Sequence, residues 1–156
     1  MEGSKKYVIN LRNKKENGED PHYDVYIGRN CGNLKATKWV NPYSQWHYPE
    51  NVCLEKFEEK FWTDEKLYGS VRELRGKVLG CFCAPKQCHG DLLAFMANME
   101  SEDEFNAIVR AQVAKFEKVK EKHRAMLKEK LEKFKKSLRI PDFVTGGFFK
   151  QHHDLF

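Results

Sequence analysis

The sequence lacks a long apolar run. Although 40% of its 156 residues are hydrophobic, no stretch approaches the roughly 18–20 consecutive apolar residues that a membrane-spanning helix needs. The first residues, MEGSKKYVINL, carry charges without the apolar segment of a secretory signal behind them. We therefore expect a protein without a membrane segment that works inside the cell. The cytoplasm is the default location, and a mitochondrial one stays open.

The sequence also has few cysteines, and their number does not suit a disulfide framework. Secreted disulfide-rich domains use an even number, whereas this chain has five. Three of the five, Cys81, Cys83 and Cys88, lie within eight residues. In an intracellular chain, such clustering favours metal binding or thiol chemistry over disulfides. Cys31 and Cys53 stand alone, and we expect both to be small buried residues of the core.

Charge is unevenly distributed along the chain. The net charge is +5, yet residues 110–139 hold twelve Lys or Arg and four Glu, a net of +8. The remainder is therefore slightly acidic. We expect three parts: a compact domain with a Cys/His cluster in residues 1–100, a long basic helix in 101–139 and an aromatic-rich tail in 140–156.

Residues 1–100 alternate between strand and helix patterns. The β-branched and apolar runs 24–29 and 78–83 predict two buried strands. Between them, residues 50–62 place apolar side chains at helical spacing. A short strand is expected at Tyr7 to Leu11 and a helix from Gly90 to Met99. This order predicts an α/β fold with a small parallel, Rossmann-like sheet, in which 24–29 and 78–83 are neighbouring parallel strands.

Two capping boxes predict further helix starts. Ser70 and Glu73 predict the start of a short helix that ends at Gly76, and Ser101 and Glu104 predict the start of a long one.

Apolar residues recur at spacings of three and four up to Leu138, which predicts an amphipathic helix about 50 Å long. That exceeds the diameter of about 35 Å expected for a hundred-residue domain. Because lysines surround the apolar stripe, we expect residues 110–139 to bind nucleic acid or a larger assembly. The alternative is a solvated helix packed on its own domain.

The segment from Leu79 to Asp91 holds the residues best suited to chemistry. Cys81 and Cys83 would face one side of a strand, and Cys88 and His89 would lie where the next helix begins. Four N or S donors are the number that a tetrahedral zinc site needs, so zinc is a candidate cofactor. The spacing is unusual for such sites, however. A second interpretation is that Cys88 is a nucleophile whose thiol pKa is lowered by the helix N-terminus. A third is that the cysteines merely pack.

The same sheet edge suits an anionic ligand. Open parallel sheets bind ligands at the carboxyl ends of their strands. Arg29 follows the first strand there and would hold the anion, while Gly90 would offer a helix N-terminus to a phosphate. His89 or Asp91 would serve as acid or base beside Cys88. Asp91 also suits a first-turn carboxylate that stabilises its helix.

Two functions follow from these residues. The first is binding or processing of a small anionic ligand, a nucleotide or a derivative, near Arg29 and Cys88. The second is a non-catalytic, zinc-stabilised module that the basic helix recruits to nucleic acid or a ribonucleoprotein. Whether the protein is an enzyme stays open.

Several separated motifs occur in a recognisable order: YIGR (26–29), NP (41–42), LRGKVLGCFCAP (74–85) and CHGDLL (88–93). They resemble a family of uncharacterised domains frequent in bacteriophages and large viruses, whose members read roughly YIGR…WGNP…LxGKxLGCWCxPxxCHGDxL. The resemblance covers about residues 24–97 and implies no activity. Residues 34–40 stand as an insertion near the WGNP turn, and Phe82 replaces the usual tryptophan. The resemblance implies a shared site of Arg29, Asn41, Cys81, Cys83, Cys88, His89 and Asp91.

Overall fold

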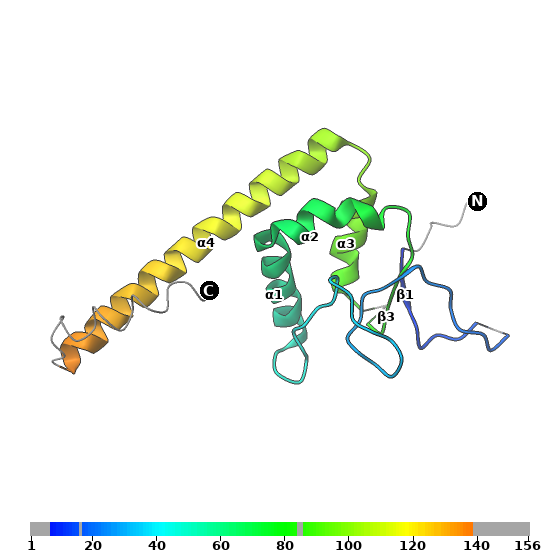
Figure 1. Ribbon diagram of the computed structural model, residues 1–156, viewed down its shortest axis with the longest axis horizontal. Helices are drawn as coiled ribbons and strands as arrows, with labels where there is room; N and C mark the ends of the chain where they lie inside the picture. Colours follow the sequence, from blue (N-terminus) through cyan, green and yellow to red (C-terminus); the bar gives the residue numbers. More distant parts are fainter. Residues whose placement is uncertain (1–6, 16, 84–85, 139–156) are drawn as a thin grey trace. The chain divides into compact units, whose positions relative to one another are not determined.

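A computed structural model describes residues 7–15, 17–83 and 86–138. It confirms the α/β fold with a small parallel sheet and a long helix after it (Figure 1). The expected tail 140–156 lies outside the described residues. The elements are β1 (Val8–Asn10), β2 (Val25–Tyr26), α1 (Glu50–Thr63), α2 (Glu65–Ser70), the 3-10 helix η1 (Val71–Leu74), β3 (Leu79–Cys81), α3 (His89–Asn98) and α4 (Glu102–Ser137).

The sheet has three parallel strands in the order β1-β3-β2. β3 is the central strand, and its Leu79 pairs with Val8 on one side and Val25 on the other. The predicted strands 24–29 and 78–83 are therefore neighbours and parallel, as expected, with α1 and α2 in the connection between them. Both are shorter than predicted because the chain leaves the ladder after Tyr26 and after Cys81.

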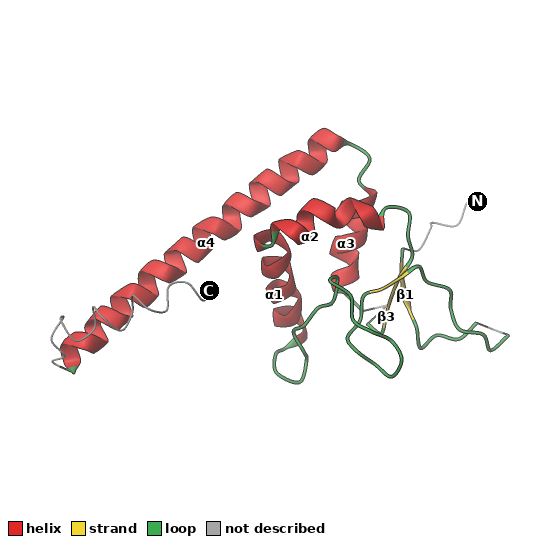
Figure 2. Ribbon diagram, viewed as in Figure 1, coloured by secondary structure: helices red, strands yellow, loops and turns green. Residues whose placement is uncertain are grey.

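The helices of the domain lie on one side of the sheet (Figure 2). α3 packs against β1 and β3, and α1 packs against α3. Gly90, in the first turn of α3, permits a close approach, because a Cβ there would lie 2.6 Å from Cδ1 of Ile27. Packing therefore holds the first turn of α3 beside the carboxyl ends of the strands. The largest fully buried side chains include Phe57, Phe61, Leu74, Leu79, Leu93 and Met96.

Both predicted helix starts are present, but only one of them has the expected capping bond. α2 begins after Asp64, whose carboxylate accepts the backbone N–H of Lys66 at 3.0 Å. The short helix η1 does follow Ser70 and ends before Gly76, as predicted, but the Ser70 side chain makes no capping bond to it. Its hydroxyl donates to the carbonyl oxygen of Lys66, in the last turn of α2. At α4, Oγ of Ser101 accepts the backbone N–H of Glu104 at 3.2 Å, as its capping box predicts.

The chain forms two compact units, Met1–Phe116 and Glu117–Phe156, and the boundary falls inside α4. In the first unit, the start of α4 belongs to the core: Phe105 is buried, and Val109, Val113 and Phe116 pack against the core residues. The compact unit thus includes the first turns of α4 in addition to residues 1–100. Within the described residues, no helix combines the length and apolar character that a membrane span requires.

Candidate functional site

The carboxyl ends of all three strands border one cavity of about 260 Å³. Arg12 follows β1, Arg29 follows β2, and Cys81 and Cys83 lie at and just after the end of β3. The start of α3 and the loop before α1 complete the wall, which is where open parallel sheets bind ligands. The structure therefore brings together six of the predicted site residues: Arg29, Asn41, Cys81, Cys83, Cys88 and His89.

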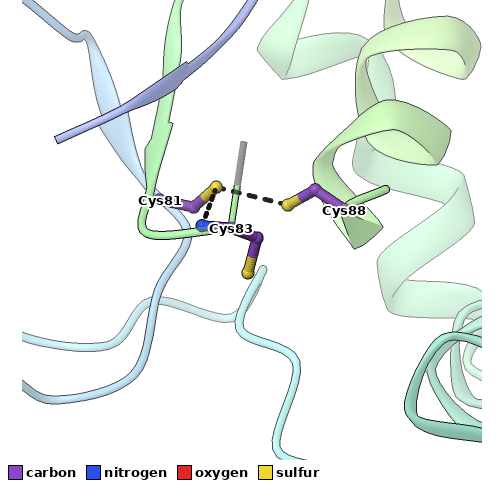
Figure 3. A group of neighbouring side chains, drawn as sticks. All are labelled: Cys81, Cys83 and Cys88. Carbon is purple, nitrogen blue, oxygen red and sulfur yellow. Dashed lines mark hydrogen bonds between the residues drawn. The ribbon is translucent and has the colours of Figure 1, made fainter. Parts of the chain in front are cut away.

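Three thiols gather at this cavity. The sulfur atoms of Cys81, Cys83 and Cys88 all lie within 4.8 Å of one another, and those of Cys81 and Cys88 point toward each other at 3.3 Å (Figure 3). The backbone N–H of Cys83 donates to Sγ of Cys81 at 3.4 Å, which ties the loop after β3 to the strand. Cys81 and Cys88 are buried, whereas Cys83 is exposed. Three soft donors this close can hold a metal ion.

Cys88 takes its place in the cluster because it is the N-cap of α3. Its Sγ accepts the backbone N–H of Gly90 at 3.4 Å, and its own N–H donates to the carboxylate of Asp91 at 2.9 Å. The backbone N–H of Asp91 also donates to the Cys88 side chain, and this bond and the one to the Asp91 carboxylate form a capping box. Asp91 therefore has the first-turn role expected of it. It also lines a second cavity, of about 430 Å³, beside Cys88 and His89.

Gly90 is buried and lines neither of these two cavities. Its N–H faces the sulfur of Cys88. The structure therefore does not place this backbone group where a phosphate in the 260 Å³ cavity would reach it.

His89 is buried next to the thiols with its ring orientation set by two neighbours. Nε2 lies 3.0 Å from the carbonyl oxygen of Ile27, and the ring packs edge-on against Phe57 at 4.7 Å between centroids. A carbonyl oxygen only accepts hydrogen bonds, so Nε2 carries the proton. Nδ1 faces Sγ of Cys88 at 3.6 Å. Burial lowers the pKa of His89, and the carbonyls of Ile27 and Trp39 oppose this in part.

The helix N-terminus does not give Cys88 a low thiol pKa. The neighbouring Cys81 and Cys83 side chains raise its pKa most, burial raises it further, and the N–H of Gly90 lowers it only in part. The pKa of Cys83 is also raised, chiefly by its contact with Cys81. This is the opposite of the lowering predicted from the helix dipole. A divalent cation among the sulfurs would reverse it by favouring the thiolates.

The YIGR turn positions Arg29 at the cavity. The hydroxyl of Tyr26 donates to the carbonyl oxygen of Arg29 at 2.5 Å. The ring of Tyr26 folds over Gly28 and leaves no room for a Cβ there. Ile27 packs against Gly90 and supplies the carbonyl that faces His89. Three of the four motif residues therefore shape the turn, and the fourth carries the charge.

Asn41 acts on the loop before α1. Its Nδ2 donates to the carbonyl oxygen of Cys53 at 3.3 Å, and its Oδ1 accepts the backbone N–H of Tyr43 at 3.0 Å. The amide thus ties the cavity wall to α1. Cys53 is buried, as expected.

Sequence reasoning missed two residues of the cavity wall. Cys31 was expected in the core but is exposed and lines the cavity, because it lies in a tight turn bridged to Leu34. Arg12 was not predicted either, although its place directly after the first strand was a usable signal. Its guanidinium lies over the ring of Phe82, 5.5 Å from the centroid.

The family model described as "Domain of unknown function (DUF4326)" matches residues 9–99. Two curated relatives are each 32% identical to the chain. Uncharacterized protein R718 of Acanthamoeba polyphaga mimivirus aligns over 97 residues, 53% of this chain and 73% of the relative. The "Uncharacterized 12.4 kDa protein in nrdA-td intergenic region" of Enterobacteria phage T4 aligns over 87 residues, 53% of this chain and 75% of the relative. No solved structure matches. The predicted resemblance to phage and viral domains is confirmed, and α4 lies outside the family match.

Proposed function

The chain belongs to the DUF4326 family of domains of unknown function, and from the geometry of its site we propose that it binds a small anionic ligand, a nucleotide or a nucleotide derivative, at the carboxyl edge of the sheet. One observation carries the proposal. A single cavity collects two arginines from the ends of two different strands, together with aromatic side chains and the three thiols. α/β domains bind nucleotides at the same edge.

The side chains of the wall suit a phosphate ester. Arg12 and Arg29 are permanently charged, and a guanidinium pairs with phosphate through two parallel hydrogen bonds. Tyr43 and Phe82 also line the cavity, and an aromatic ring there can stack on a base. The cavity, about 260 Å³, lies just below the range of roughly 300–1,000 Å³ usual for drug-sized ligands. Its size favours a mononucleotide or a smaller phosphate ester.

Zinc is the metal that we assign to the three thiols. Thiolates are soft ligands that select zinc over magnesium or calcium, and zinc binds them with Zn–S distances of about 2.3 Å. Cys81 lies at the end of β3 and Cys88 at the start of α3, and their sulfur atoms meet across the loop between these elements. A metal there would join β3 to α3 and stabilise the cavity wall. Processing of the ligand by Cys88, His89 and Asp91 is the alternative to this metal site, because a thiolate that binds zinc is not free to attack a substrate.

The test is ligand binding by the purified full chain, by isothermal titration with inorganic phosphate, ribose 5-phosphate and the common nucleoside monophosphates. We expect at least one ester to bind, and Arg29→Gln to weaken it about tenfold or more, or about 1.4 kcal/mol. Arg75→Gln is the matched control, because Arg75 is exposed and precedes β3, away from the carboxyl edge. Binding of none of these probes, or equal binding by both variants, contradicts the proposal.

A second candidate function rests on the second unit. Its part of α4 exposes Met126, Leu127, Leu131 and Phe134, and lysines lie between them along the helix. Cationic helices bind nucleic acid by neutralising phosphates. We propose recruitment to nucleic acid or a ribonucleoprotein as the role of this segment, independent of the anion site.

A further inference from the structure

We infer that Nδ1 of His89 is the fourth ligand of the zinc ion, so that Cys81, Cys83, Cys88 and His89 form a closed site with no position left for substrate. The inference rests on the proposal that the three thiols hold zinc, and it states how the coordination is completed. It also implies that the metal does not bind the anionic ligand, although the metal site and the arginines line the same cavity.

The hydrogen bond to Ile27 prepares His89 for this role. Since the carbonyl oxygen of Ile27 fixes the proton on Nε2, the neutral ring presents the lone pair of Nδ1 to Cys88. Metal-binding histidines usually donate their other ring N–H to a carbonyl or carboxylate, which orients the ring and raises its basicity. The packing of Phe57 against the ring further restricts its rotation.

Two of the six ligand–ligand distances are near the values that tetrahedral coordination requires. Zn–S of about 2.3 Å and Zn–N of about 2.0 Å place sulfur and nitrogen ligands about 3.5 Å apart, and two sulfur ligands about 3.8 Å apart. Nδ1 of His89 lies 3.6 Å from Sγ of Cys88. Sγ of Cys81 lies 3.3 Å from the same Cys88 sulfur. Two edges of the tetrahedron are thus nearly formed, although Cys88 and His89 are adjacent in sequence.

To complete the tetrahedron, the cysteine side chains must move. The three sulfur atoms all lie within 4.8 Å of one another, but the group within that distance does not include a nitrogen of His89. Because Ile27 and Phe57 hold its ring, the thiols must turn toward Nδ1. Cys83 is the exposed member of the three and has the most freedom to move.

A closed site changes what the cavity can do. Three thiolates and one Zn²⁺ carry a net charge of about −1, which does not attract an anion. The attraction must then come from Arg12 and Arg29. Catalytic zinc sites keep one position for water or substrate, whereas four protein ligands are typical of structural sites.

The first experiment needs no variant. We expect the purified full chain to carry about one zinc by elemental analysis, and its zinc-edge X-ray absorption to show three sulfurs and one imidazole. Zinc bound without an imidazole signature overturns the inference and leaves the thiol site standing. A chain that binds no zinc, even when supplied with it, overturns both, while the anion-binding measurement stays independent.

The second experiment measures zinc affinity by competition with a chelator. We expect His89→Gln to weaken zinc binding about tenfold or more, and His123→Gln, at an exposed position of α4, to leave it unchanged. Equal affinity of the His89 and His123 variants contradicts the inference. If the His89 variant does not fold, the absorption spectrum of the unaltered chain decides.

Discussion

At the scale of single residues, packing explains motif positions that invite a chemical interpretation. Gly90 opens α3, where a phosphate site is expected from sequence, yet its position against Ile27 is what excludes a side chain. Gly28 is likewise covered by Tyr26. The contact of Gly90 with Ile27 joins segments far apart in sequence, so spacing alone could not distinguish a glycine that packs from one that binds.

Buried His89 should make the stability of the protein depend on pH. Burial lowers its pKa in the folded chain, whereas the unfolded value is about 6.5. The unfolded chain therefore binds the proton more readily. This contribution to stability is complete above about pH 6.5 and is lost as the pH falls from there through the folded pKa, by at most about 1.4 kcal/mol per pH unit.

Urea denaturation between about pH 7.5 and about pH 5, with a chelator present so that metal release does not contribute, measures this dependence. His89→Gln should flatten the acid side of the curve, and His123→Gln should not. An unchanged slope in the His89 variant would assign the dependence to another group.

At the scale of elements, regular apolar spacing was sufficient for prediction where one face of a helix is buried. Phe57 and Phe61 of α1 are both fully buried, as their spacing requires. The start of α2 was not predicted, although Asp64, which caps it, is a good capping residue. Ser70 was predicted to cap the next short helix, and η1 does begin after it, but without a side-chain capping bond. Local preference alone does not decide which residue makes a capping bond.

The capping box of α3 should contribute measurably to stability. Asp91→Ala would leave the backbone N–H of Cys88, at the N-cap of α3, without its acceptor. We expect the free energy of unfolding to fall by about 1 kcal/mol in urea denaturation. Asp91→Glu is the matched control, because glutamate at this position makes the same reciprocal bond. A decrease in the glutamate variant as large as in the alanine variant would show that Asp91 acts in another way.

At the scale of the whole molecule, one topological rule predicted most of the candidate site. Parallel strands place their carboxyl ends at one edge, and this brought Arg29 to the cysteines from more than fifty residues away. The rule did not predict that Cys31 lines the cavity, because its exposure depends on a turn in the loop after β2. It also did not predict the raised pKa of Cys88, which depends on the contact of its thiol with those of Cys81 and Cys83. Both are properties of tertiary packing.

The proposed role of α4 also rests on a feature at this scale. Its pattern continues from Val109, Val113 and Phe116, which pack against the core of the first unit, to apolar residues that stay exposed in the second, such as Leu127 at 52% and Phe134 at 59%. Exposed apolar side chains between lysines fit a partner that is itself anionic. The family match ends at residue 99, so this segment adds to the shared domain rather than completing it.

If the helix binds nucleic acid, its lysines should set the salt dependence of binding. Replacing Lys128, Lys130, Lys133 and Lys136 by Gln removes four exposed charges and keeps good helix formers. Replacing the same four by Arg keeps the charge. Binding of labelled RNA and DNA by the full chain over a salt series should weaken in the Gln variant. The slope of log K against log salt should fall by about 0.7–0.9 for each phosphate that the variant no longer neutralises, while the Arg variant keeps the original slope. Because counterion release depends on charge alone, a Gln variant that binds as well as the Arg variant, or binding that salt does not affect, would exclude recruitment through these lysines and leave the exposed apolar side chains to a protein partner.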